Sequence, residues 1–472
     1  MAKNQRDEER RAGRALRPDL PRSAHAAWEP ASDRPDPIVV LGAQNRGRIA
    51  ELVPVRWGRM LESPFAFLRG AALVMARDLE TTPVSGITVQ ACGDAHVANF
   101  GVFASPERIL LFDVNDFDET LPGPFEWDLK RLASSAVVAA RATLGDRQGV
   151  EGARAAVRSY RKHMHRYAAM SVLDVWYDRV DADAATHALG SVPAASIEAV
   201  LAQARRHTSQ AALPKLTALT DDGGRRIIDH PPLVTHDVGV RDTDMLLPLL
   251  HSYRLSLGDD HRVLLDRFTV TDVARKVVGV GSVGTRCFIA LMTSDVGEPL
   301  FLQVKEAGVS VLAGHSVSAV SGGGQSSGAA PDPDPNPDPD PAPVPGHGRE
   351  GRRVVDGQRI MQAASDIFLG SASWRDRDYY VRQLRDMKGT VNVGALDAVG
   401  FVSYLELCGW TLARAHARSG PAAMIDGYVG QGDGFDRAVA RFAVAYADQT
   451  ERDHALLEAA VRSGRIEATP GV

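Results

Sequence analysis

The chain has 472 residues and a formal net charge of -5, which gives no support for a general polyanion-binding surface, so we expect no nucleic-acid partner. Hydrophobic residues make up 44%, enough for two or three cores. No apolar run approaches the roughly 18 residues that span a bilayer, the charged N-terminus does not resemble a secretory signal, and three separated cysteines are typical of a reducing compartment. We therefore expect a cytoplasmic protein without a membrane partner.

The N-terminal 1–37 segment is rich in Arg, Pro, Asp and Ala, a composition typical of a disordered tail. A basic arm that touches nucleic acid is the alternative interpretation. Residues 38–270 are predicted to form a mainly helical region. Within it, Ser63 followed by Pro64 indicates the start of a helix. Arg69 stands between apolar neighbours in that helix, and it could pair with a structural carboxylate or reach a phosphate.

A polar loop follows a predicted strand at 86–92 and reads Gly-Asp-Ala-His-Val-Ala-Asn-Phe-Gly. Asp94 and Asn99 have the D-x-x-x-x-N spacing of a kinase catalytic loop. In that chemistry Asp94 would orient or deprotonate the attacking hydroxyl group, and Asn99 would be a magnesium ligand. We expect both side chains on a loop at a strand end, where a rigid scaffold displays catalytic groups.

A second predicted strand, at 108–114, runs into three closely spaced carboxylates. Magnesium prefers oxygen ligands, and Asp116 is the favoured ligand, with Asp113 and Asp118 as its rivals. If the segment alternates faces, Asp116 and Asp118 point the same way and could share one metal cluster. The alternative is an acidic hairpin end whose carboxylates are only solvated.

A glycine-rich segment precedes two further predicted strands. It contains Gly279, Gly281, Ser282 and Gly284. A dinucleotide-binding turn opens a helix, whereas residues 287–292 predict a strand, and the next strand ends at Lys305. This order is typical of a kinase glycine loop, whose backbone amides cover phosphates while the lysine pairs with them. A dinucleotide site and a plain hairpin are the alternatives.

The rest of the chain divides around a low-complexity segment at 313–350, whose Gly/Ser and Asp-Pro stretches cannot build a core and predict a disordered insertion. Residues 271–312 and 351–395 are predicted to form a small antiparallel-sheet region that binds a nucleotide. Residues 396–472 are predicted to be helices that return to the large region.

The predicted lysine raises a question about its acidic partner. In a kinase this partner comes from the next helix, and no glutamate stands at the expected place. Asp356, Asp366 and Glu306 are the carboxylates that the neighbouring sequence offers.

Two sets of motifs resemble known families. Residues 93–101 and the Asp-Phe-Asp at 116–118 resemble the G-D-x-H-x-x-N … D-F-D pattern of aminoglycoside-phosphotransferase-like kinases. Across most of residues 55–420 the chain resembles a bacterial family catalogued as domain of unknown function 2252. The motifs that carry this second resemblance include SPFAFLRGAA, PFEWDLKRLASS, VVGVGSVGTR, VDGQRIMQAASDIFLG, YVRQLRDMKG and LARAHARSG.

The kinase resemblance implies an α+β, two-lobed fold with a small antiparallel-sheet nucleotide lobe and a large helical lobe. In such a fold the order of this chain would be circularly permuted, because Asp94 and Asp116 precede Gly279 and Lys305. Asp128 would brace the catalytic loop, and His416 would be a packed helix residue.

The resemblance also implies an ATP-dependent phosphotransferase that uses ATP and Mg²⁺. Its acceptor would be an unidentified hydroxyl group on a small molecule or a protein. The alternatives are a non-catalytic nucleotide-binding regulatory module and a nucleotidyl transferase.

Overall fold

The computed structural model describes residues 2–188, 194–221, 223–236, 240–314, 349–384 and 386–472. The fold is α+β, as expected, with 52% helix, 17% strand and small antiparallel sheets. The insertion predicted at 313–350 lies outside the described residues except at its two ends.

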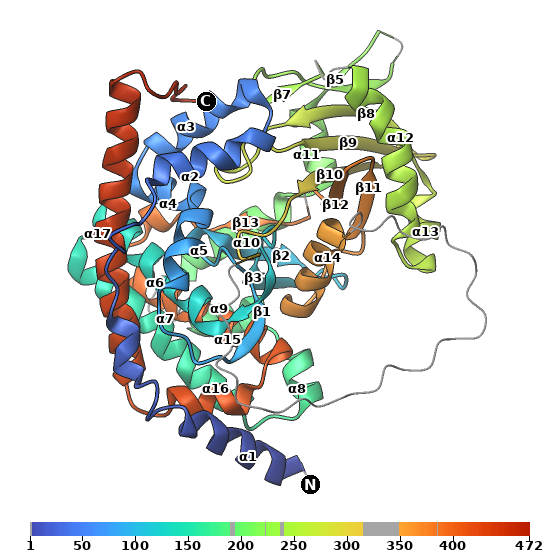
Figure 1. The fold of residues 1–472 in the computed structure, drawn as a ribbon. Coiled ribbons are helices and arrows are strands. Elements are labelled where there is room, and N and C mark those ends of the chain that lie inside the picture. Colours follow the sequence, from blue (N-terminus) through green and yellow to red (C-terminus); the bar gives the residue numbers. More distant parts are fainter. Residues whose placement is uncertain (1, 189–193, 222, 237–239, 315–348, 385) are drawn as a thin grey trace.

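Six strands form the larger sheet in the order β11-β12-β10-β9-β8-β7, and all neighbours are antiparallel (Figure 1). These strands are β7 (Val234–Thr235), β8 (Phe268–Lys276), β9 (Cys287–Ser294), β10 (Pro299–Ala307), β11 (Gly370–Trp374) and β12 (Arg377–Gln383). The glycine-rich turn, residues 279–284, joins β8 to β9. It therefore leads into a strand and not into the helix that a dinucleotide-binding turn would open.

Both faces of the larger sheet are covered. Alternate residues of a strand point to opposite faces. Phe288 and Ala290 of β9 pack with helices α12 (Val240–Leu255) and α13 (Asp259–Leu265), whereas Ile289 packs toward α11 (Ser209–Leu216) and β6 (Arg225–Ile227). The apolar run of β9 is therefore continuous because neither face meets solvent. Residues 240–265 belong with this sheet and not with the large helical region to which we had expected them to belong.

A second core is mainly helical and includes two small sheets (Figure 1). Its main helices are α6 (Phe125–Arg141), α7 (Asp146–Tyr167), α14 (Arg349–Met361), α15 (Ala398–Ser419), α16 (Ala422–Val429) and α17 (Gly434–Arg462). The small sheets pair β1 (Thr88–Ala91) with β4 (Leu121–Pro124), and order β13 (Gly389–Thr390), β2 (Phe100–Ala104) and β3 (Leu110–Val114). Strand β2 was not predicted, and β13 joins this sheet although it falls in the segment expected to bind nucleotide.

Four short helices lie between α17 and the glycine-rich turn: α2 (Pro37–Gln44), α3 (Val53–Leu61), α4 (Pro64–Gly70) and α5 (Ala72–Glu80). The predicted start of α4 is confirmed, because the Ser63 hydroxyl accepts a hydrogen bond from Ala66 N at 3.1 Å. Val280 of the turn shares an apolar cluster with these helices and with Leu457 of α17. The turn is therefore packed against the N-terminal helices.

Further elements complete the described chain. They are α8 (Val172–Tyr177), α9 (Ala182–Ala188), α10 (Ala194–Arg206) and β5 (Thr217–Leu219), which pairs with β6. Among the residues described, no helix combines the length and apolar character needed to cross a bilayer.

The N-terminal segment differs from the disordered tail that its composition suggested. Helix α1 (Ala2–Ala15) packs on α16. Arg17 Nε donates to Tyr428 O at 3.0 Å and Arg22 Nη1 donates to Val429 O at 2.8 Å. These arginines satisfy carbonyl groups at the C-terminal end of α16, which lack partners inside their own helix. Composition alone does not reveal such a role.

Candidate functional site

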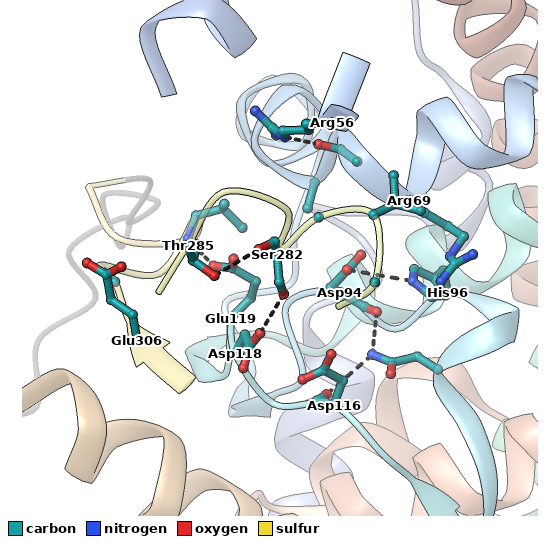
Figure 2. A pocket seen from close by; sticks show the side chains of 18 of the residues that line it. Arg56, Arg69, Asp94, His96, Asp116, Asp118, Glu119, Ser282, Thr285 and Glu306 are labelled. Carbon is teal, nitrogen blue, oxygen red and sulfur yellow. Dashed lines mark hydrogen bonds and ion pairs between the residues drawn. The ribbon is translucent and has the colours of Figure 1, made fainter. Parts of the chain in front are cut away.

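A cavity of about 490 Å³ opens between the glycine-rich turn, the Asp94 loop (residues 93–99) and the acidic loop (residues 115–120) (Figure 2). This volume lies within the usual range of small-molecule sites. The predicted site residues that line the cavity are Asp94, Asn99, Asp116, Asp118, Gly279, Gly281 and Ser282. Lys305 reaches the same place from β10, and Gly284 packs on Arg48 at the base of the turn. The structure therefore brings together segments that are far apart in the sequence.

The backbone of the Asp94 loop is held from helix α6. The carboxylate of Asp128 accepts hydrogen bonds from Cys92 N at 2.6 Å and Gly93 N at 3.0 Å. His416 Nε2 lies 3.0 Å from the same carboxylate and is fully buried. The expected bracing role of Asp128 and the packed position of His416 are both confirmed. Gly93 has a φ of +80°, and a Cβ there would lie 2.4 Å from Glu119 O, so only glycine fits.

Asp94 presents one carboxylate oxygen to the protein and leaves the other toward the cavity. Its Oδ1 accepts from Arg131 Nε at 2.9 Å and Nη2 at 2.6 Å, while Oδ2 lies 3.7 Å from His96 Nε2. Burial raises the pKa of Asp94 to about 6, although Arg131 opposes the shift. A fixed carboxylate that ionises just below neutral pH is suited to accept a proton.

Asn99 links the two loops. Its Nδ2 donates to Asp94 O at 3.0 Å and to Asp116 O at 3.3 Å. Because the nitrogen holds the backbone, the side-chain oxygen is the atom left to bind a ligand.

Lys305 finds its acidic partner on the acidic loop. Its Nζ lies 2.6 Å from Asp118 Oδ2 and 3.5 Å from Asp116 Oδ1. Burial alone would raise the pKa of Asp118, but Lys305 and a hydrogen bond from Tyr380 outweigh it and lower the pKa to about 2. Ser282 Oγ of the glycine-rich turn also donates to Asp118 Oδ2, at 3.1 Å. Asp118 thus joins the turn, the sheet and the acidic loop.

The three carboxylates that the sequence offered as partners of Lys305 are engaged elsewhere. Asp356 lies 3.2 Å from Arg352, Asp366 accepts from Phe368 N at 2.9 Å, and Glu306 pairs with Arg377. The partner was missed because it comes from an earlier part of the chain and not from the following helix.

Asp113, a rival of Asp116 as metal ligand, does not reach the cavity. It has no exposed surface, and both of its oxygens lie 2.7 Å from Arg414 Nη2. Its Oδ2 also accepts from Ala363 N at 2.8 Å. Asp113 therefore ties β3 to α15 inside the helical core.

The chemistry of the donor atoms around Asp116 is of the kind that magnesium binds, namely carboxylate and amide oxygens. Asp116 Oδ1 is buried and receives no hydrogen bond from a described residue, with Lys305 Nζ 3.5 Å away. The Asn99 amide holds the backbone through its nitrogen and not through its oxygen. Within the described ranges, no three His, Cys, Asp or Glu side chains form a ready-made metal cluster. Magnesium does not require one, because it usually takes one or two carboxylates together with water and substrate phosphates.

Basic side chains that sequence reasoning had mostly left unassigned also line the cavity. They are Arg48, Arg56, Arg69, Arg377, Arg382 and Lys388. Arg56 is fully buried and bonds to Gln44 Oε1 at 2.7 Å and Gly70 O at 2.9 Å. Burial, assisted by Arg382, lowers the pKa of Lys388 to about 7. The sequence signal was weak, because only Arg69 had been singled out, from its apolar neighbours.

The comparisons with known proteins identify a family. The family model described as an uncharacterized protein conserved in bacteria (DUF2252) matches residues 48–328 and 338–460, which include every predicted site residue that lines the cavity. Neither the curated proteins nor the solved structures contain a match to this chain. The chain belongs to this bacterial family.

Proposed function

We propose that the protein is an ATP-dependent phosphotransferase that uses magnesium and transfers a phosphoryl group to a hydroxyl acceptor. The observation that carries this proposal is the meeting of Lys305 with Asp118 and Asp116, at 2.6 and 3.5 Å, under a glycine-rich turn. A phosphoryl-transfer site needs these parts together: a turn over the phosphates, a lysine, oxygen ligands for the metal and a carboxylate for the acceptor.

We further propose a kinase-like, two-lobed fold in circularly permuted order. Support comes from the end of α15, where Ser419 Oγ accepts a hydrogen bond from Gln90 N of β1 at 2.9 Å. A chain that ran from α15 directly into β1 would have the order of a kinase: glycine-rich turn, lysine, helix, catalytic loop, metal carboxylate. Such rearrangements are tolerated where the ends that must join are close.

Each residue has a defined role in this proposal. The turn and Lys305 bind the nucleotide phosphates, and Asn99 and Asp116 would hold the metal. When bound, magnesium neutralises negative charge on the transferring group. Asp94 Oδ2 accepts the proton of the acceptor hydroxyl while Arg131 fixes the other oxygen. Asp118 had been expected as a second metal ligand, but its contacts favour a role as the partner that orients Lys305.

The experiment is a calorimetric titration of the purified protein with ATP, with and without magnesium, and with NAD as a negative control. Magnesium-dependent ATP binding that is lost in Asp116→Ala supports the proposal. The matched control is Asp266→Ala, which removes an exposed carboxylate that pairs with Arg254 and does not line the cavity. Binding that ignores both magnesium and Asp116 would instead identify a regulatory nucleotide module.

Product analysis separates the two group-transfer reactions. Phosphoryl transfer leaves ADP, whereas nucleotidyl transfer releases pyrophosphate. Pyrophosphate release from ATP would contradict the phosphotransferase proposal.

A further inference from the structure

Arg69 occupies a position between the glycine-rich turn and the Asp94 loop. It is the penultimate residue of helix α4, and its carbonyl oxygen lies 3.4 Å from the point where a Cβ on Gly281 would stand. Its charge interacts with the carboxylates of Asp94 and Asp116. Figure 2 shows Arg69 on the side of the cavity where Asp94 and His96 lie. Arg69 therefore lines the same cavity as Asp94 and the glycine-rich turn.

The guanidinium group of Arg69 has no partner in the part of the chain that the structure describes. Its Nε is buried without a hydrogen bond, and neither terminal nitrogen makes a hydrogen bond or an ion pair to a described residue. The neighbouring Arg131 is different, because it binds Asp94 and also donates to Leu68 O at 2.8 Å. The carboxylate partner that we had considered for Arg69 is therefore not found among the described residues.

The charges that line the cavity also indicate that Arg69 is available to bind an anion. Five carboxylates of the described residues line it, and three of them are paired with cations: Asp94 with Arg131, Asp118 with Lys305, and Glu306 with Arg377. Of the other two, Asp116 Oδ1 lies 3.5 Å from Lys305 Nζ, and Glu119 Oε2 accepts a hydrogen bond from Val311 N at 2.7 Å. The lining cations that have no carboxylate within ion-pair distance in the described ranges include Arg48, Arg69 and Lys388. A half-buried arginine remains charged, and leaving it unpaired is costly. The cavity therefore contains cationic side chains that no described carboxylate pairs with, and these side chains are suited to bind an anionic ligand.

Arg48 and Arg69 lie at different ends of the cavity, so we expect them to bind different groups. Arg48 lies under the turn, where its Nη1 donates to Val283 O and its side chain packs against Gly284. It faces the place of the nucleotide phosphates. Arg69 lies at the Asp94 end, which is the place of the acceptor.

We propose that Arg69 forms an oxyanion subsite beside Asp94, and that the acceptor is a small hydroxylated molecule that carries a phosphate or carboxylate group. Arginine suits this task because its planar fork binds such groups through two parallel hydrogen bonds. In the transfer step the acceptor O–H proton goes to Asp94 Oδ2, a new O–P bond forms, and the bond from the γ-phosphorus to ADP breaks. This inference rests on the proposed function. A polycationic acceptor such as an aminoglycoside would meet like charge here.

The packing of the turn also favours a small acceptor. Ile49 N donates to Gly284 O at 2.7 Å, and Arg59 Nη1 donates to Gly279 O. The segment before α4 therefore covers the turn at both ends. A protein acceptor would have to displace these contacts, whereas a small molecule can enter the existing cavity.

The first test is a calorimetric titration of the nucleotide-free protein with inorganic phosphate. We expect binding that weakens about tenfold or more in Arg69→Gln, because a hydrogen-bonded charge pair is lost. Arg69→Lys should retain part of the affinity, and the exposed Arg77→Gln on α5 should equal the wild type. Thermal melts establish that each variant is folded. No phosphate binding by the wild type, or equal binding by Arg69→Gln, would overturn the subsite.

The second test assigns the oxyanion to the acceptor or to the nucleotide. Phosphate is titrated into protein saturated with magnesium and a non-hydrolysable ATP analogue, and separately with magnesium and ADP. Arg69-dependent phosphate binding in the presence of the analogue supports an acceptor subsite. Binding with ADP alone would assign Arg69 to the γ-phosphate and overturn the anionic acceptor.

The two proposals fail separately. If ATP does not bind but phosphate binds through Arg69, the phosphotransferase proposal fails and the oxyanion subsite stands. If ATP binds through Asp116 but phosphate ignores Arg69, the reverse holds.

Discussion

Asp113 and Asp118 belong to one acidic stretch, and each pairs with a cation from a distant part of the chain. The Asp113–Arg414 pair is sealed, with both side chains 0% exposed. In the Lys305–Asp118 pair the lysine is 3% exposed and the carboxylate 25% exposed, and the carboxylate faces the cavity. The first pair cannot exchange partners without unfolding, whereas a ligand phosphate can reach the second. The comparison indicates that Asp113 stabilises the fold, whereas Asp118 is placed to take part in ligand binding.

The largest expected effect comes from breaking the sealed pair. Asp113→Ala leaves the Arg414 cation buried and uncompensated, so we expect a loss of about 3–5 kcal/mol in the free energy of unfolding. Denaturant titration measures it. The exposed pair of Arg254 and Asp266 gives the control, since Asp266→Ala should cost much less stability than Asp113→Ala. A loss below 1 kcal/mol for Asp113→Ala would remove the distinction between the two carboxylates.

Breaking the Lys305–Asp118 pair, here called the cavity pair, should reduce stability less than Asp113→Ala does, but it should weaken ATP binding. In Lys305→Met the Asp118 carboxylate keeps hydrogen bonds from Tyr380 and Ser282, so we expect a loss of about 1–3 kcal/mol in unfolding free energy. ATP affinity should fall at least about tenfold, because an ion pair with phosphate is removed. The comparison breaks if Lys305→Met destabilises the protein as much as Asp113→Ala, or binds ATP as tightly as the wild type.

The pH dependence of turnover and of stability distinguishes Asp94 from Asp118. Because burial raises the pKa of Asp94 to about 6, turnover should fall about tenfold for each pH unit below 6, as the base becomes protonated. Folded Asp94 binds a proton more readily than unfolded Asp94, so its contribution to stability decreases as pH rises through 6. The pKa of Asp118 is instead lowered, to about 2. Its stabilising contribution is present above about pH 4 and is lost only as pH falls toward 2.

Measuring both quantities from pH 4 to 8 tests this assignment. Turnover and the Asp94 part of stability should change in opposite directions over the same range, and Asp94→Asn should abolish both dependences. A turnover profile that is flat across pH 6 would exclude Asp94 as the base.

Local signals in the sequence predicted the elements that depend on local chemistry. The start of α4 follows from Ser63 and Pro64, and the strands β9 and β10 after the glycine-rich turn follow from their apolar sequences. The pattern around Asp94 and Asn99 correctly located a loop that lines the cavity. In each case the residues that determine the geometry are neighbours in the chain.

Contacts between distant segments could not be predicted in this way. Asp118 pairs with Lys305 because the larger sheet packs over the acidic loop, and no spacing rule links the two positions. Asp113 was a rival metal ligand because the sequence does not show that Arg414, 301 positions later, pairs with it inside the helical core. The arginines of the N-terminal segment indicated disorder until their carbonyl partners on α16 were known.

We expect the smallest change in stability and ATP affinity from removing the hydrogen bond between Ser282 and Asp118. Ser282→Ala removes the hydrogen bond from Ser282 Oγ to Asp118 Oδ2, a part-buried contact of 3.1 Å, so we expect at most about 1 kcal/mol of lost stability. The Lys305–Asp118 ion pair should remain, because its 2.6 Å contact does not pass through the serine. ATP affinity should therefore change less than in Lys305→Met. If Ser282→Ala reduced ATP affinity as strongly as Lys305→Met, the serine and not the lysine would be the main phosphate contact, and the cavity pair would lose its proposed role.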